Sequence, residues 1–227
     1  MLIAYIIFGV FALISWMISR NLKSKFERYS QLPIPRGMTG KDVAVKMLRD
    51  NGIYDVQVTS TTGHLTDHYD PTTKTVNLSE NVYGSSNVAA AAIAAHECGH
   101  AVQHAMAYAP LTLRSKLVPV VNFASNWMQW ILLAGIIFVR TFPQLMLIGI
   151  MLFALTTLFS FITLPVEINA SSRALVWLNT AGITNYETHE QAKDALKTAA
   201  YTYVVAALGS LATLVYYIMI YLGGSRR

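Results

Sequence analysis

The sequence has few charged residues and almost no cysteine. Only 13% of its 227 residues are charged, against about a quarter in soluble domains, while 54% are hydrophobic. This balance favours a membrane protein over a soluble one. A single cysteine, Cys98, excludes an intramolecular disulfide framework.

Charge is absent altogether from four apolar runs of the chain. Each run is close to the roughly 20 residues that cross about 30 Å of hydrocarbon as a helix, so four transmembrane helices are predicted. The second run is interrupted by three side-chain amides, which either face other helices or mark a segment lying partly in the membrane interface. The runs are residues 2–18, 117–139, 145–166 and 199–222, and the amides are Asn122, Asn126 and Gln129.

The first run lacks the features of a cleaved signal peptide. No basic residue precedes it and no small-x-small cleavage site follows it. Four basic residues follow it instead, between Arg20 and Arg28. We therefore expect a transmembrane signal anchor over residues 1–19, with its N-terminus outside and the following chain in the cytoplasm.

The remaining topology follows from the distribution of basic residues. Residues 20–116 contain eleven of the seventeen Lys and Arg and are predicted to form a cytoplasmic domain. Two transmembrane helices joined by an outside loop are expected over residues 117–166, cytoplasmic helices over 167–198, and a last transmembrane helix with a tail over 199–227. The net charge of +5 fits attraction to anionic lipid. No interleaved aromatic and basic patch favours a nucleic acid, so the expected partner is the lipid bilayer.

The domain over residues 20–116 carries recognisable start and stop signals. Thr39 is a helix-capping residue, Gly52 is a helix stop, and an alanine-rich segment from Ala89 to Ala95 predicts close packing against another helix. Residues 61–73 are rich in turn formers. The expected elements are a helix from Thr39 to Asn51, strands over residues 54–59 and 74–79, and a long helix from Ser86 or Asn87 through His104.

The long helix contains the pattern His-Glu-x-x-His at His96, Glu97 and His100. Residues four apart lie on one helix face, so both imidazoles can bind one metal ion. Glu97 is rotated about 100° from His96, where it can contact a metal-bound water without binding the metal. The pattern therefore predicts a catalytic zinc site with Glu97 as the base.

Several segments resemble the YugP-type bacterial membrane zinc metallopeptidases, a gluzincin-like family of neutral zinc metallopeptidases. The resemblance implies zinc-dependent peptide hydrolysis, and together with the span pattern it implies an α+β membrane protein. We expect a small zincin-like peptidase unit on the cytoplasmic face of about four transmembrane helices. The resembling segments are residues 39–40, 51–56, 65–71, 74–79, 94–103 and 164–171.

Glu167 is the predicted third metal ligand. It falls at the cytoplasmic end of the third apolar run, on the side predicted for His96 and His100. Its surroundings also resemble the glutamate-bearing helix of CAAX prenyl proteases and HtpX-type peptidases. Those enzymes place Asp four residues after the glutamate, where this chain has Ser171. The alternative is an interfacial carboxylate at the start of a helix after Pro165, favoured by the helix dipole.

Other polar residues receive more ordinary interpretations. His104 lies one turn too far for a shared metal, and Cys98 is expected to be packed. Asp67 and Asp70 either orient a zinc-bound histidine or make turn hydrogen bonds, the commoner role. The remaining candidates are His64 and His68 for substrate contacts, and Arg173, His189, Tyr201 and Tyr203 for stabilising an oxyanion.

The predicted function is zinc-dependent hydrolysis of peptide bonds in membrane or membrane-associated proteins. Residues 74–79 are expected to form an edge strand that pairs with an extended substrate. Intramembrane cleavage is disfavoured because the apolar stretch before His96 is too short to span a bilayer. A membrane adaptor or holdase with a structural zinc is the alternative from another class, although Glu97 would then have no use.

Overall fold

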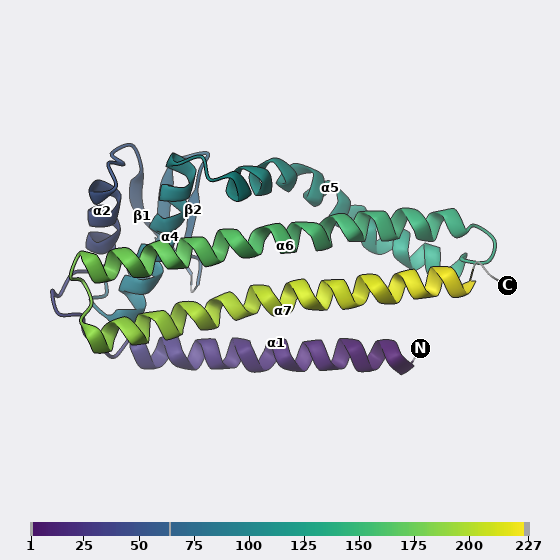
Figure 1. Cartoon of the computed structure of the whole chain (residues 1–227), viewed down its shortest axis with the longest axis horizontal. Helices are drawn as coiled ribbons and strands as arrows, with labels where there is room; N and C mark the ends of the chain where they lie inside the picture. The colour runs from purple at the N-terminus through teal and green to yellow at the C-terminus, as the bar shows by residue number, and fades with distance from the viewer. Residues whose placement is uncertain (1, 64, 225–227) are drawn as a thin grey trace. The chain divides into compact units, whose positions relative to one another are not determined.

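The computed structural model describes residues 2–63 and 65–224, which fall into two compact units (Figure 1). The first unit, here the apolar unit, comprises residues up to Met17, Thr112–Leu164 and the residues from Thr202 onward. The second, here the mixed unit, comprises Ile18–Leu111 and Pro165–Tyr201.

Four helices in the described part of the chain are long and apolar enough to cross a membrane, as the sequence predicts. Two of them contain 38 and 39 residues, so each is about 57–59 Å long and exceeds the roughly 30 Å hydrocarbon core. A single helix runs through Pro165, so Glu167 lies inside a helix rather than at the start of a new one. The four helices are α1 (Leu2–Tyr29), α5 (Ala109–Ile137), α6 (Pro143–Thr180) and α7 (Tyr186–Gly224).

Glycines allow α5 and α6 to approach closely within the apolar unit. A Cβ added at Gly135 would lie 2.7 Å from the Cα of Met146, and one at Gly149 would lie 2.8 Å from Leu132. Leu132 and Met146 form a small buried cluster with Ile150. Small residues commonly serve this purpose between membrane helices, where close van der Waals packing drives association.

The mixed unit combines a three-stranded sheet with short helices and with the ends of longer ones. It contains the last part of α1, the last part of α6 and the first part of α7. Its own elements are α2 (Gly40–Asp50), β1 (Gln57–Thr61), β2 (His68–Asp70), β3 (Thr75–Ser79), α3 (Glu80–Tyr83) and α4 (Val88–Ala105).

The sheet has the order β1-β3-β2, so β3 is its central strand. The expectation that residues 74–79 form an edge strand is therefore wrong. β1 pairs with β3 in parallel, and β2 pairs with the other side of β3 in antiparallel register. The free edges belong to β1 and β2.

The other strands also depart from the sequence prediction, because a strand exists only where it has a partner. β1 begins at Gln57, opposite Thr75, rather than at Tyr54, which is 80% exposed. The segment predicted as turns contains β2, and its Tyr69 pairs with Val76. The turn that follows is held by Asp70, which accepts hydrogen bonds from the Thr72 backbone and the Thr73 hydroxyl.

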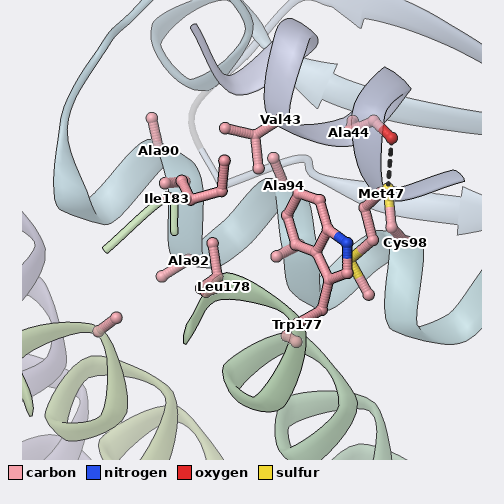
Figure 2. Close-up of a cluster of buried hydrophobic side chains, with 14 of the residues drawn as sticks. Val43, Ala44, Met47, Ala90, Ala92, Ala94, Cys98, Trp177, Leu178 and Ile183 are labelled. Atoms are coloured by element: carbon pink, nitrogen blue, oxygen red, sulfur yellow. Dashed lines mark hydrogen bonds between the residues drawn. The ribbon is translucent and has the colours of Figure 1, made fainter. Parts of the chain in front are cut away.

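The alanine-rich half of α4 packs against α2, as predicted (Figure 2). Ala90, Ala92 and Ala94 are buried; Figure 2 shows Val43 of α2 close to Ala94, and Ala92 close to Leu178. Figure 2 also shows the thiol of Cys98 donating to the backbone carbonyl of Ala44. Small side chains on α4 thus let the two helices lie close together.

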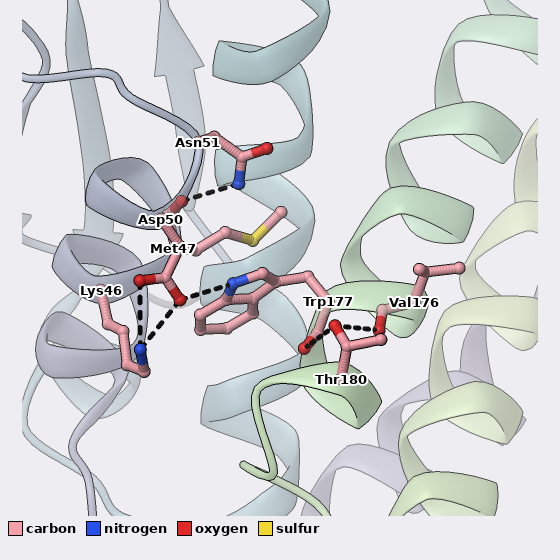
Figure 3. A network of polar contacts seen from close by, with 7 residues as sticks. All are labelled: Lys46, Met47, Asp50, Asn51, Val176, Trp177 and Thr180. Carbon is pink, nitrogen blue, oxygen red and sulfur yellow. Dashed lines mark hydrogen bonds and ion pairs between the residues drawn. The ribbon is translucent and has the colours of Figure 1, made fainter.

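A polar network ties α2 to α6 at the edge of this core (Figure 3). The indole nitrogen of Trp177 donates to Asp50 Oδ2 at 3.0 Å, and the Lys46 ammonium approaches the same oxygen at 2.8 Å. The hydrogen bond from Lys46 holds the pKa of Asp50 below its usual value. Trp177 itself is buried, so its ring and its hydrogen bond both hold the last part of α6 against α2.

The start of α2 provides a stability prediction. Thr39 accepts a hydrogen bond from the Asp42 backbone N–H, and the Asp42 carboxylate accepts one from the Thr39 N–H. Replacing Thr39 by Ala removes one half of this capping box and is expected to cost about 1 kcal/mol of unfolding free energy. Chemical unfolding in detergent, followed by circular dichroism, measures the loss. Thr39→Ser keeps the oxygen and should stay near the parent, whereas an unchanged Thr39→Ala protein would contradict the capping role.

Candidate metal centre

Two helices of the mixed unit bring His96, His100 and Glu167 together. The histidines come from α4 and the glutamate from α6, and one ligand atom of each lies within 4.8 Å of the other two. Glu167 Oε2 is 3.3 Å from His96 Nε2 and 3.5 Å from His100 Nε2. The three residues that the sequence analysis selected as metal ligands are thus adjacent in space.

The two distances between Glu167 and the histidines suit a tetrahedral metal ion. Zinc binds histidine nitrogen and carboxylate oxygen at roughly 2.0–2.2 Å, and at a tetrahedral angle two such atoms lie about 3.3–3.5 Å apart. The two nitrogen-to-oxygen distances, 3.3 and 3.5 Å, fall in that range. The imidazole rings are nearly perpendicular, at 83°, with centroids 4.8 Å apart.

The electrostatics of the cluster favour a cation. Glu167 Oε2 is buried and has no hydrogen-bond partner among the described residues. Burial by itself lowers the pKa of His100, but the adjacent Glu167 carboxylate and the charge of Glu97 reverse this effect, and the net pKa of His100 is raised. The site therefore attracts positive charge, whether a proton or a metal ion, and the donor set fits zinc.

Gly99 allows α4 and α6 to come close enough for this arrangement. A Cβ added to Gly99 would lie 2.6 Å from the backbone oxygen of Ala170 and 3.1 Å from its Cα. Ala170 follows Glu167 by one helical turn. The glycine inside the His-Glu-x-x-His pattern therefore positions the helix that carries the third residue of the cluster.

Both histidines are oriented through their other ring nitrogens. His100 Nδ1 lies 3.1 Å from Gln103 Oε1, and His96 Nδ1 lies 3.0 Å from Ser171 Oγ. Gln103 Nε2 donates to the Val166 carbonyl, so Oε1 is the atom that faces His100 and it must accept. His100 thus carries a proton on Nδ1 and turns its Nε2 toward the cluster.

Gln103 and Ser171 show what the sequence analysis missed and what it left open. Gln103 lies three residues after His100 and is fully buried, a combination that the motif alone does not reveal. Ser171, whose role the sequence left open, contacts His96 through its hydroxyl. The network continues to Asn169, whose Oδ1 accepts from Gln103 and from Arg173 Nε.

Glu97 and Cys98 occupy different environments on α4. Glu97 lies beside the cluster without belonging to it, is 8% exposed, and accepts no hydrogen bond from the described residues. Cys98 is completely buried, and burial raises the pKa of its thiol well above the usual value. The thiol therefore belongs to the core, as the sequence analysis expected.

The other polar candidates lie outside the cluster. Asp67 accepts from the Ser79 backbone and hydroxyl, so it and Asp70 make turn and strand-end hydrogen bonds. His104 is exposed and contacts the Tyr69 hydroxyl, and the ring of Tyr201 lies near Lys197. His68 contacts Thr66 and Asn77, and His189 contacts Thr184. Tyr203 lies on α7. His64 is outside the described residues.

Comparison with known proteins identifies the family of the chain. A family model described as "Putative neutral zinc metallopeptidase" matches residues 4–222. A protein of Bacillus subtilis (strain 168) named "Putative membrane protease YugP" is 43% identical over 211 residues, which cover 93% of each chain. No solved structure matches the chain. The chain belongs to the family of putative neutral zinc metallopeptidases.

Proposed function

We propose that this protein is a membrane-embedded zinc endopeptidase that cleaves membrane or membrane-associated proteins. The observation that carries the proposal is the cluster of His96, His100 and Glu167, beside which Glu97 stands as a buried carboxylate with no other described role. A purely structural zinc site needs no such base. Membership of a zinc metallopeptidase family and the four long apolar helices support the proposal.

Each residue of the site has a distinct task in this proposal. His96, His100 and Glu167 would hold zinc, which supplies a Lewis acid and lowers the pKa of water. Glu97 accepts the proton of the attacking water and delivers it to the leaving amine nitrogen as the peptide bond breaks. Gln103 and Ser171 are positioning residues that hold the two imidazoles in place.

The side of the membrane is part of the proposal. The charge distribution of residues 20–116 predicts that the mixed unit faces the cytoplasm. Substrates would then be cytoplasmic segments of membrane proteins, or proteins held at the inner membrane surface. In a Cys98→Ser background, we expect a single cysteine at Gln144 to be labelled by an impermeant reagent in intact cells and one at the exposed Asn179 to be protected.

Zinc binding and hydrolysis are tested together on the purified protein in detergent. We expect about one zinc per chain, hydrolysis of an unfolded protein substrate, loss of hydrolysis after chelation, and recovery when zinc is added back. Glu167→Gln replaces a charged ligand by a neutral amide and should lower the zinc content after dialysis. Glu187→Gln, on an exposed first turn of α7, serves as the matched control.

The outcomes separate this proposal from its rival. A parent protein that retains zinc but cleaves no substrate would favour the adaptor or holdase with a structural zinc. Parent-like zinc and parent-like hydrolysis in Glu167→Gln would remove Glu167 from the site.

A further inference from the structure

A cavity of about 490 Å³ lies within the mixed unit, beside the N-terminal half of α4. Its size falls in the roughly 300–1,000 Å³ range of ligand pockets. The last turns of α1 form one wall, with Leu22 and Phe26, and Leu65 lies at the loop before β2. On α4, the lining residues are Ala89, Ala90 and Ile93.

The cavity lies on the face of α4 that carries the metal cluster. Ala89, Ile93, His96 and His100 follow one another at intervals of four, three and four residues, which places them on one helix face. Ile93 precedes His96 by about 4.5 Å along the helix axis. From Val88 to Gln103, Ile93 and His96 alone are half-exposed, and every other residue is buried. The half-exposed part of α4 is thus the turn between Ile93, which lines the cavity, and His96, which belongs to the cluster.

Leu65 is a second feature that favours a ligand site at this cavity. Its side chain is 59% exposed although it is large and apolar, and its backbone has φ of 61°. A non-glycine residue with positive φ is strained, and such strain persists where the surroundings require it, often at ligand sites. Here the strained residue presents an apolar side chain at the lining of the cavity.

The mixture of lining groups favours a peptide over an acyl chain. Between the apolar side chains lie amides and hydroxyls, among them Gln31, Asn81 and Ser85. These groups can hydrogen-bond to the backbone of an extended peptide, whereas an acyl chain would desolvate them without compensation. The exposed charges of Lys23 and Glu27 on the α1 wall oppose each other, and the Asp67 carboxylate in the lining is engaged by hydrogen bonds from Ser79.

We propose that this cavity is the substrate-binding groove of the peptidase and that it takes a bulky apolar side chain of an extended peptide next to the bond to be cleaved. The inference rests on the proposed function, since it assigns a substrate class to the same site. Leu22, Phe26, Leu65 and Ile93 supply the apolar contacts. The enzyme should therefore discriminate among peptides by one large apolar residue.

The test measures peptide binding separately from cleavage. Two labelled decapeptides that differ in one residue, Phe or Ala, are titrated against zinc-loaded Glu97→Gln protein, and binding is followed by fluorescence anisotropy. Leu65→Asn replaces the apolar side chain by one that tolerates positive φ, and Ile93→Phe narrows the groove. Each should weaken binding of the Phe peptide by roughly tenfold and leave the Ala peptide nearly unchanged. Tyr54→Asn, an exposed residue away from the cavity, should change neither.

Two results would overturn the groove assignment. One is a parent-like preference for the Phe peptide in both Leu65→Asn and Ile93→Phe. The other is that Glu97→Gln protein with an unaltered groove binds the two peptides equally and that a long-chain fatty acid displaces both. That result would identify an acyl chain as the occupant of the cavity. A third result separates the two proposals. If Leu65→Asn and Ile93→Phe lose the preference for the Phe peptide, but the parent protein with Glu97 intact cleaves neither peptide, the proposed function is wrong and the cavity is still a peptide-binding groove.

Discussion

Glu97→Gln is expected to abolish hydrolysis while leaving about one zinc per chain. The amide cannot accept the proton of the attacking water, and general-base catalysis of this kind contributes about 10²–10⁴-fold to the rate. Zinc should stay because Glu97 lies outside the cluster of His96, His100 and Glu167. The two side chains have nearly the same shape, so the buried site should keep its packing.

The measurement compares kcat and zinc content of parent and variant in the same detergent. Glu80→Gln, an exposed glutamate in the first turn of α3, is the matched control and should retain full activity. Parent-like hydrolysis by Glu97→Gln would disprove its role as the base. Loss of zinc as well as activity would instead assign Glu97 to the metal ligands.

Gly99→Ala is expected to have the second large effect, this time on the metal. The added Cβ would lie 2.6 Å from the Ala170 backbone oxygen, well short of the 3.4 Å at which ordinary contact begins. The obstructing atom is the backbone oxygen of Ala170, so the clash cannot be relieved by rotating a side chain. The helices α4 and α6 must therefore move apart. Metal sites tolerate about 0.2 Å in ligand distance, so a shift of several tenths of an ångström separates Glu167 from the histidines.

We expect Gly99→Ala to lower zinc affinity by at least about tenfold and kcat/KM by roughly 10²-fold, since a misplacement near 1 Å has that effect on a positioned site. Competition with a zinc chelator measures the affinity. Gly84→Ala is the control, because the nearest atom to its added Cβ is 3.7 Å away and its φ is negative. Parent-like zinc affinity in Gly99→Ala would show that the close approach of the two helices is not required.

Features that depend on neighbouring residues along the chain were predictable from the sequence. The apolar runs predict the four long helices, because helix length and side-chain transfer energy are local properties. Thr39 and Asp42 form the capping box within one turn. The spacing of His96 and His100 predicts a shared face because a helix repeats every 3.6 residues.

Glu167 is a residue distant from the histidines in the sequence that could nevertheless be predicted to lie near them. Charge distribution and family resemblance selected it, and the structure places it against both histidines although 66 residues lie between it and His100 in the sequence. Its helix, however, is not the one expected. The residue lies within α6, which continues through Pro165, because tertiary packing can accommodate a proline that local rules treat as a boundary.

Only the tertiary structure decided the position of each strand and the supports of the metal cluster. Residues 75–79 alternate in the same way whether a strand is central or at an edge, so the sequence could not show that β3 has partners on both sides. Gln103 resembles any polar residue near a helix end until its contacts with His100 and the Val166 carbonyl are known. Gly99 likewise becomes meaningful only when Ala170 lies against it. These features depend on contacts between residues far apart in the chain, and such contacts leave no local pattern.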